Sequence, residues 1–339
     1  MATYFTSQIP TFVAVSPEDS VVIRLYRGQT LVFSTTLYTY MTRAYVRDLR
    51  PIIEQDLREA NKCNDLYDLT MFDRNGEETI STFTAVYCEI GLNQSVNNFI
   101  ETHFLTTSTS LLCSRIANQL AYLAWATETV YLSKYVVYRD KDGKIGVYRE
   151  TPRTVSSDGY VHYIITDPAS YAYLGTILSI TVTLNKRSYT YYYTDDDCGF
   201  KAFYKNPFNV LELIQLPGVT SLGTKVERSE AVIQHCTTFY DQNVINAFDF
   251  QSAPLPHTLA THALELATSQ EVYLVDREFE DFDELPLILI TDSDISASDK
   301  RSELSSIKFT YRYDDDIIHT TIPDAPGQPF NSVYQLPYT

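Results

Sequence analysis

The stretch TILSITVTLNKRSYTYYY, residues 176–193, decides the fold class. Its two halves are rich in β-branched and aromatic residues, which are the residue types favoured in strands. Between them lies Asn185-Lys186, which reads as a tight turn. The pattern therefore predicts two antiparallel strands, Thr176–Leu184 and Arg187–Tyr193.

Similar signals surround this hairpin. Strands are expected at 129–138 and 144–148, on either side of Asp142-Gly143, a dipeptide that supplies the positive φ angles of a tight turn. A further strand is expected at 160–166. The segment 119–126 fits a buried helix or a strand, and its β-rich surroundings favour the strand. Residues 93–205 are thus predicted to form a β domain.

The N-terminal part reads as a smaller β-sandwich with one helix, residues 1–92. Strands are predicted at 21–26, 30–38, 66–72 and 79–89, the last two flanking Asn75-Gly76. Between the strands at 30–38 and 66–72, the spacing of the apolar residues changes from that of a strand to that of a helix. A short helix is predicted from Leu49, Ile52, Ile53 and Leu57, with Asp48 as its N-cap and Pro51 in its first turn.

The C-terminal part reads as a mixed β domain with one helix, residues 206–323, followed by an extended, proline-containing arm, residues 324–339. The helix is expected at 257–268. Extended segments are expected at 209–216, 231–240, 271–275, 287–291 and 306–313. Because strands do not alternate with helices, the pattern argues against a doubly wound parallel sheet. The predicted fold is mainly β, with multidomain β-sandwich-type units and a few short helices.

Composition and charge narrow the function. The chain has 339 residues and a formal net charge of −17, which disfavours binding to nucleic acid or to an anionic membrane surface. No signal peptide and no membrane-inserting segment are expected. The five cysteines are widely spaced, as expected of free buried thiols in a reducing compartment.

The sequence contains no complete catalytic or nucleotide-binding motif. Gly218 and Gly223 have P-loop spacing, but Thr224 precedes Lys225, which reverses the order that phosphate and Mg²⁺ binding require. His257 and His262 are five residues apart, which does not fit a zinc-binding helix. There is no GxSxG nucleophile motif. We expect no enzyme activity and no cofactor.

A calcium-loop template matches in part. Asp292, Asp294, Ser296 and Glu303 occupy positions 1, 3, 5 and 12, but the glycine of position 6 is replaced by Ala297. A polar loop between strands is the favoured interpretation, so no metal site is predicted and these four residues remain weak candidates.

Tyrosine is the strongest compositional signal, with 27 residues. Its ring gives contact area and its hydroxyl a polar tip, which suits protein interfaces. Alternate strand residues face opposite sides, so a run such as 189–193 cannot place every ring in a core. The interface candidates are Tyr189, Tyr191, Tyr192, Tyr193, Tyr311, Tyr313, Tyr334 and Tyr338.

The order of several local patterns resembles a known family. These patterns are AYVRDLRPIIE at 44–54, TAVYCE at 84–89, NPFN at 206–209 with Glu212, Gly218 and Arg228, FDFQSAPL at 248–255, EVYLV at 271–275 and IKFTY at 307–311. Together they resemble large proteins of tailed phages and prophages of Bacteroidales bacteria.

The resemblance implies a structural, distal-tail-like protein of the phage tail tip or baseplate. Such a protein would be assembled in the host cytoplasm, would become part of the virion, and would contact other tail proteins and copies of itself in a ring. It carries over no functional residue. Two alternatives stay open: a carbohydrate-binding protein that recognises a host surface glycan through tyrosines, and a glycan-directed hydrolase with two carboxylates.

Overall fold

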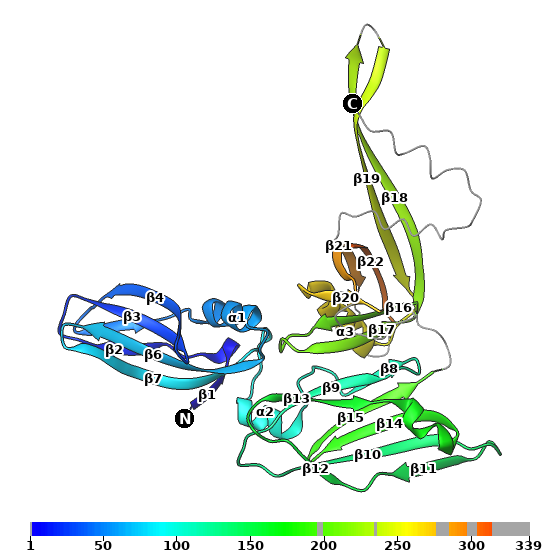
Figure 1. The fold of residues 1–339 in the computed structure, drawn as a ribbon, viewed down its shortest axis with the longest axis horizontal. Coiled ribbons are helices and arrows are strands. Elements are labelled where there is room, and N and C mark those ends of the chain that lie inside the picture. Colours follow the sequence, from blue (N-terminus) through cyan, green and yellow to red (C-terminus); the bar gives the residue numbers. More distant parts are fainter. Residues whose placement is uncertain (1, 195–198, 234–235, 276–284, 297–303, 314–339) are drawn as a thin grey trace.

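The computed structural model describes residues 2–194, 199–233, 236–275, 285–296 and 304–313. The protein is mainly β, with several sheets and a few short helices (Figure 1). This confirms the fold class predicted from the sequence. Glu303, Tyr334, Tyr338 and the segment 324–339 lie outside the described residues.

The first sheet has the order β1-β7-β6-β3-β4, antiparallel except for the parallel pair β1 and β7. The two-stranded sheet β2–β5 and helix α1 share its core, so residues 2–86 form a sandwich. The element bounds are β1 Ala2–Phe5, β2 Phe12–Val15, β3 Ser20–Arg27, β4 Thr30–Tyr38, β5 Arg43–Val46, α1 Arg50–Glu59, β6 Asn64–Asp73 and β7 Gly76–Val86.

The second sheet has the order β11-β10-β14-β15-β8, and β12 also pairs with β10. The pair β13–β9 and a 3₁₀ segment complete this unit. The bounds are α2 Val96–Thr102, β8 Ser110–Cys113, β9 Asn118–Leu123, β10 Val130–Arg139, β11 Ile145–Arg149, β12 Arg153–Val155, β13 Val161–Thr166, the 3₁₀ segment Pro168–Leu174, β14 Thr176–Leu184 and β15 Arg187–Tyr193.

The third sheet has the order β17-β16-β20-β21-β22-β19-β18, and α3 packs on it through its buried leucines and alanines. Strand β16 comes first in the chain among the strands of this sheet, and it was predicted to belong to the end of the second unit. The bounds are β16 Phe200–Lys205, β17 Leu211–Leu216, β18 Gly218–Ile233, β19 Cys236–Ser252, α3 His257–Thr268, β20 Val272–Leu274, β21 Leu287–Ser296 and β22 Ser306–Tyr313.

Strands β18 and β19 form a hairpin that extends far beyond the rest of the third sheet (Figure 1). They pair from Gly218 and Ser252 at the base to Ile233 and Cys236 at the tip, about 50 Å of strand. Strand β19 also pairs with β22, but only over 248–251. Beyond this root, β18 and β19 pair only with each other among the described strands. We call residues 224–233 and 236–246 the arm.

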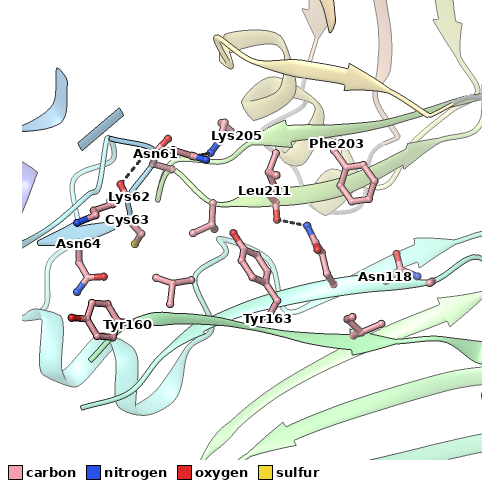
Figure 2. Close-up of a pocket in the computed structure, with 16 residues that line it drawn as sticks. Asn61, Lys62, Cys63, Asn64, Asn118, Tyr160, Tyr163, Phe203, Lys205 and Leu211 are labelled. Carbon is pink, nitrogen blue, oxygen red and sulfur yellow. Dashed lines mark hydrogen bonds between the residues drawn. The ribbon is translucent and has the colours of Figure 1, made fainter. Parts of the chain in front are cut away.

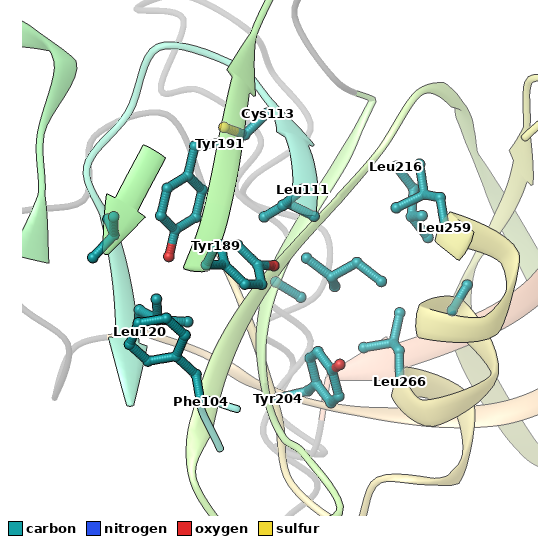
Figure 3. Close-up of a cluster of buried hydrophobic side chains, with 14 of the residues drawn as sticks. Phe104, Leu111, Cys113, Leu120, Tyr189, Tyr191, Tyr204, Leu216, Leu259 and Leu266 are labelled. Atoms are coloured by element: carbon teal, nitrogen blue, oxygen red, sulfur yellow. The ribbon is translucent and has the colours of Figure 1, made fainter. Parts of the chain in front are cut away.

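The three units meet at shared cores. One core joins the second and third units and contains Tyr189, Tyr191 and Tyr204 (Figure 3). A smaller core, here called the junction core, draws on all three units: the ring of Phe99 lies 5.6 Å from that of Phe5 and 5.2 Å from that of Phe208.

Most local expectations are confirmed. The turns at 142–143 and 185–186 join β10 to β11 and β14 to β15, with positive φ at Gly143 and Asn185. Segment 119–126 contains a strand, β9. The predicted Asp48 cap is wrong: Asp48 has φ 56°, and Leu49 takes the N-cap position without a side-chain hydrogen bond. Leu49 is buried in the first core, and that packing fixes how the chain enters α1.

Candidate functional site: an assembly surface and a junction cleft

Four of the eight tyrosines predicted at an interface are core residues, which corrects that prediction. Tyr189, Tyr191 and Tyr193 alternate along β15 and face the core shared by the second and third units, and Tyr311 lies in the same core. Only Tyr192, between them, is strongly exposed. Tyr313 is half-buried. The alternation itself was expected; which side would be buried was not.

The buried rings pack tightly against other aromatic residues. The ring centroids of Tyr189 and Tyr191 are 5.0 Å apart, and the Tyr191 hydroxyl donates to the backbone oxygen of Gln119. Burial raises the pKa of both hydroxyls well above the usual value. These residues therefore stabilise the fold and offer no surface to a partner (Figure 3).

Three of the most exposed large apolar side chains lie on the first unit, around the end of β4. Tyr38 is 83% exposed, Tyr40 71% and Met41 76%. Tyr40 and Arg43 exchange two backbone hydrogen bonds across a two-residue turn, in which Met41 and Thr42 both have positive φ, 48° and 65°. Left-handed backbone is unfavourable for such residues. The chain thus adopts a strained turn that presents two large apolar side chains to solvent.

Strand β4 is an edge of the first sheet, paired only with β3 among the described strands. The Thr39 amide donates to Asp19 of the chain entering β3, so the backbone groups of every second residue from Thr39 face β3. The amides and carbonyls of Ser34, Thr36 and Tyr38 consequently face away from the sheet. Strand β4 contains no charged residue or proline, two of the usual protections of an edge, and its pairing with β3 has a bulge at Val32, before these outward-facing residues.

The root of the arm is held by close backbone packing. A Cβ on Gly199 would lie 2.0 Å from the carbonyl oxygen of Gly218, the first residue of β18. A Cβ on Gly218 would lie 2.4 Å from the carbonyl oxygen of Gln251 on β19. Both positions therefore require glycine, and this packing fixes where the hairpin leaves the third sheet.

The three weak calcium candidates within the described residues do not lie on a loop. Asp292, Asp294 and Ser296 belong to β21, where they pair with Thr310, Lys308 and Ser306 of β22. Asp292 and Asp294 line a shallow cavity of about 390 Å³ together with Asp249 and Lys308. The Lys308 ammonium adds a positive charge to this cavity. Among the described residues, no group of three or more His, Cys, Asp or Glu side chains is arranged to hold a metal ion.

The P-loop-like glycines also lie in extended structure. Gly218 and Gly223 are both on β18, paired with Ser252 and Ala247 of β19. A phosphate-binding loop needs backbone amides that converge at a helix N-terminus, and β18 offers none. The order of the residues and their backbone conformation thus both argue against a nucleotide-binding site at Gly218 and Gly223.

A cleft of about 590 Å³ lies where the three units meet (Figure 2). It is lined by the α1–β6 connection, by β9 and β13, and by β16, β17 and their turn. The side chains that line it are mainly amides and aromatic or aliphatic groups, with no aspartate or glutamate among the described residues: Asn61, Lys62, Cys63, Asn64, Ala117, Asn118, Gln119, Tyr160, Val161, Tyr163, Ile165, Phe203, Lys205, Asn209, Val210 and Leu211.

Hydrogen bonds across this cleft tie the units together. Asn209, in the turn between β16 and β17, donates to the Lys62 carbonyl at 2.9 Å, and Asn64 donates to the Gly159 carbonyl at 2.9 Å. The Lys205 ammonium donates to Asn61, and burial lowers the pKa of Lys205. The pattern NPFN at 206–209 therefore lies at the contact between units.

A buried polar cluster joins the second and third units. Glu212 of β17 accepts hydrogen bonds from Thr106 at 2.7 Å and from Asn206 at 2.8 Å. Its Oε1 lies 3.7 Å from Nε2 of His262 on α3. Burial raises the pKa of Glu212 to about 7 and lowers that of His262. The cluster holds the helix, the sheet and the loop before β8 together.

No known family model matches the chain, and no curated protein matches its sequence. Among solved structures, the calcium-binding domain CBD12 of CALX1.1 is 10% identical with a TM-score of 0.17, over 54% of this chain and 74% of that one. The plexin A4 extracellular region is 8% identical with a TM-score of 0.21, over 91% of this chain and 38% of that one. At these TM-scores neither likeness supports a shared fold or function.

No helix in the described parts of the chain is long and apolar enough to cross a membrane.

Proposed function

We propose that the protein is a non-enzymatic structural component of a phage tail tip or baseplate, which assembles with copies of itself and with other tail proteins. The observation that carries the proposal is the arm. Two-stranded β-ribbons are marginally stable alone in water, and the arm has no third strand among the described residues of its own chain. A ribbon of this length gains its stability from a partner.

The surface of the first unit supports the same function. Tyr38, Tyr40 and Met41 form an exposed apolar group beside an uncharged edge strand. Contiguous exposed apolar groups are typical of interaction sites. The net charge of −17 favours protein partners over nucleic acid. The virion tail, reached by assembly in the host cytoplasm, is the location we propose.

The test is self-association of the full-length chain. Light scattering after size exclusion, over a series of protein concentrations, should show oligomers, and negative-stain images should show closed rings. Antibodies against the chain should label the tail tip of phage particles. A chain that stays monomeric at every concentration, or particles labelled elsewhere, would contradict the proposal.

Carbohydrate binding is the second candidate function, and the junction cleft favours it. Tyr160 and Tyr163 present exposed rings, and Asn61, Asn64 and Gln119 present amides. Aromatic faces and amides suit sugar faces and hydroxyls. The described lining holds no carboxylate pair of the kind that glycoside hydrolysis needs. Glycan-array binding that is lost on Tyr160→Ala and Tyr163→Ala would support this function over assembly alone.

A further inference from the structure

The β4 edge has unpaired backbone groups, and the arm lacks a third strand among the described residues. The outward backbone groups of Ser34, Thr36 and Tyr38 recur every second residue, so an added strand could exchange hydrogen bonds with each of them. This geometry is that of β-strand addition to an exposed sheet edge. The absence of charge along Thr30–Tyr38 leaves nothing to repel an incoming strand.

The two strands of the hairpin differ in their number of charged residues, and this difference indicates which of them can pair with a further strand. Strand β18 contains Lys225, Glu227, Arg228 and Glu230. Strand β19 has only Asp241 and Asp249 among its 17 residues. Charged residues protect an edge against pairing. Over residues 236–247, β19 pairs with no described strand other than β18. The outer edge of β19 is therefore the edge that is open to pairing with a further strand.

The arm and the β4 edge of one chain lie far apart (Figure 1). In Figure 1 the hairpin extends from the third sheet on the side opposite to the second unit, and β4 runs along the upper edge of the first unit, with α1 between it and the third unit. An arm in this position cannot reach β4 of its own chain, so the partner strand comes from another molecule.

We propose that β19 of the arm of one copy pairs with β4 of the next copy and extends its first sheet. This inference rests on the proposed assembly function and names the contact that performs it. The contact is heterologous, since it joins two different surfaces. Each copy offers one arm and one edge, so the contact closes into a ring where the rotation between copies allows it.

The test uses two variants that each lose one half of the contact. Thr36→Pro removes an outward amide of β4 and breaks no hydrogen bond to β3, and proline is tolerated at such edge positions. Thr36→Val keeps the amide and is its matched control. In the second variant, Asn-Gly replaces residues 225–245, so that the pair Thr224 and Asn246 closes a tight hairpin. Circular dichroism and cooperative melting verify that each variant is folded.

Each variant alone should be monomeric, and Thr36→Val should assemble like the wild type. An equimolar mixture should form a one-to-one complex of twice the monomer mass that grows no further. In this complex the arm of the Thr36→Pro copy pairs with the open edge of the trimmed copy. Should Thr36→Pro fail to fold, Thr36→Lys replaces it as an edge-blocking charge.

The outcomes separate the two proposals. Trimmed copies that assemble like the wild type would show pairing of β4 with itself or another contact, and would overturn this inference while leaving the assembly function intact. A mixture that remains monomeric while the wild type forms oligomers would do the same. A wild type that is monomeric throughout would overturn both.

Discussion

Glu212 Oε1 lies 3.7 Å from Nε2 of His262, with both side chains buried between β17 and α3. Glu265, on the same helix as His262, also faces this cluster through its bond to Tyr204. Burial disfavours the charged form of each group, so it raises the pKa of both glutamates and lowers that of the histidine. Thr106 and Thr107 of the second unit donate hydrogen bonds to Glu212 and Glu265, so the contact between the second and third units is sensitive to pH.

Glu212→Gln should change the pH dependence of stability. The pKa of Glu212 is about 7 in the folded state, against an ordinary value of 4.5. Between these pH values the folded chain keeps a proton that the unfolded chain releases. The free energy of unfolding of the wild type therefore falls as pH rises, by up to about 1.4 kcal/mol per pH unit from this group. The variant lacks this contribution.

Urea unfolding of both proteins from pH 4.5 to 8 measures the effect. The stability of Glu212→Gln relative to the wild type should increase from pH 4.5 to 7 and then level off. The exposed Glu78→Gln is the control and should show a constant difference. A constant difference for Glu212→Gln as well would contradict the assignment.

Asp56→Ala should destabilise the first unit by about 2 to 3 kcal/mol, the usual loss for hydrogen bonds to a charged group. Asp56 of α1 accepts from Arg27 Nε at 2.8 Å and from the Tyr67 hydroxyl at 2.6 Å, and Tyr67 is fully buried. Tyr67→Phe, which removes one of these bonds, should cost less. Chemical denaturation checks both, and a loss below 0.5 kcal/mol for Asp56→Ala would show that the network is unimportant.

Thr42→Gly should stabilise the protein by about 1 kcal/mol. Thr42 has φ 65°, a conformation that glycine adopts without the steric cost that a β-branched residue meets. The same change at Thr36, in extended strand, should instead lower stability. Thermal unfolding compares the two. A lower melting temperature for Thr42→Gly would mean that the turn is not strained.

Cys63 and Cys88 should resist alkylation in the native protein. Burial raises the pKa of Cys63 to about 12 and that of Cys88 to about 11, so very little reactive thiolate exists at pH 8. Iodoacetamide treatment followed by peptide mass spectrometry, with and without urea, measures this directly. Equal labelling of these two peptides in both conditions would contradict their burial.

Gly199→Ala should destabilise the third sheet by about 2 to 3 kcal/mol, because its Cβ would meet the Gly218 carbonyl, which is backbone and cannot rotate away. Gly91→Ala is the matched control, since a Cβ there meets nothing within 4 Å. Hydrogen exchange in β18 would report loosening at the root of the arm. Equal stability of the two variants would argue against close packing there.

Local features of the fold could be predicted from the sequence because they depend on neighbouring residues. The turn at Asn185 and the helix at His257–Thr268 follow from turn chemistry and apolar spacing. Asp48 was misassigned as a cap because the burial of Leu49, a tertiary contact, determines how the helix begins.

The surfaces depend on topology, which local patterns do not contain. The strand at 30–38 was predicted, but its place at a sheet edge follows from the pairing of β3 with β6 on the other side. The uncharged sequence of that strand was the available signal. The cleft could not be predicted, since Asn61, Tyr163 and Lys205 come together only when three units pack.

The junction core has a consequence for how the chain is made. Phe5 packs against Phe99 and Phe208, which follow it in the chain and are therefore synthesised after it. The first unit can form its sandwich early, but its contact with the rest stays open until Phe208 has left the ribosome. Until then the nascent protein carries an apolar patch without its partner, and we expect this interval to be where a chaperone would act.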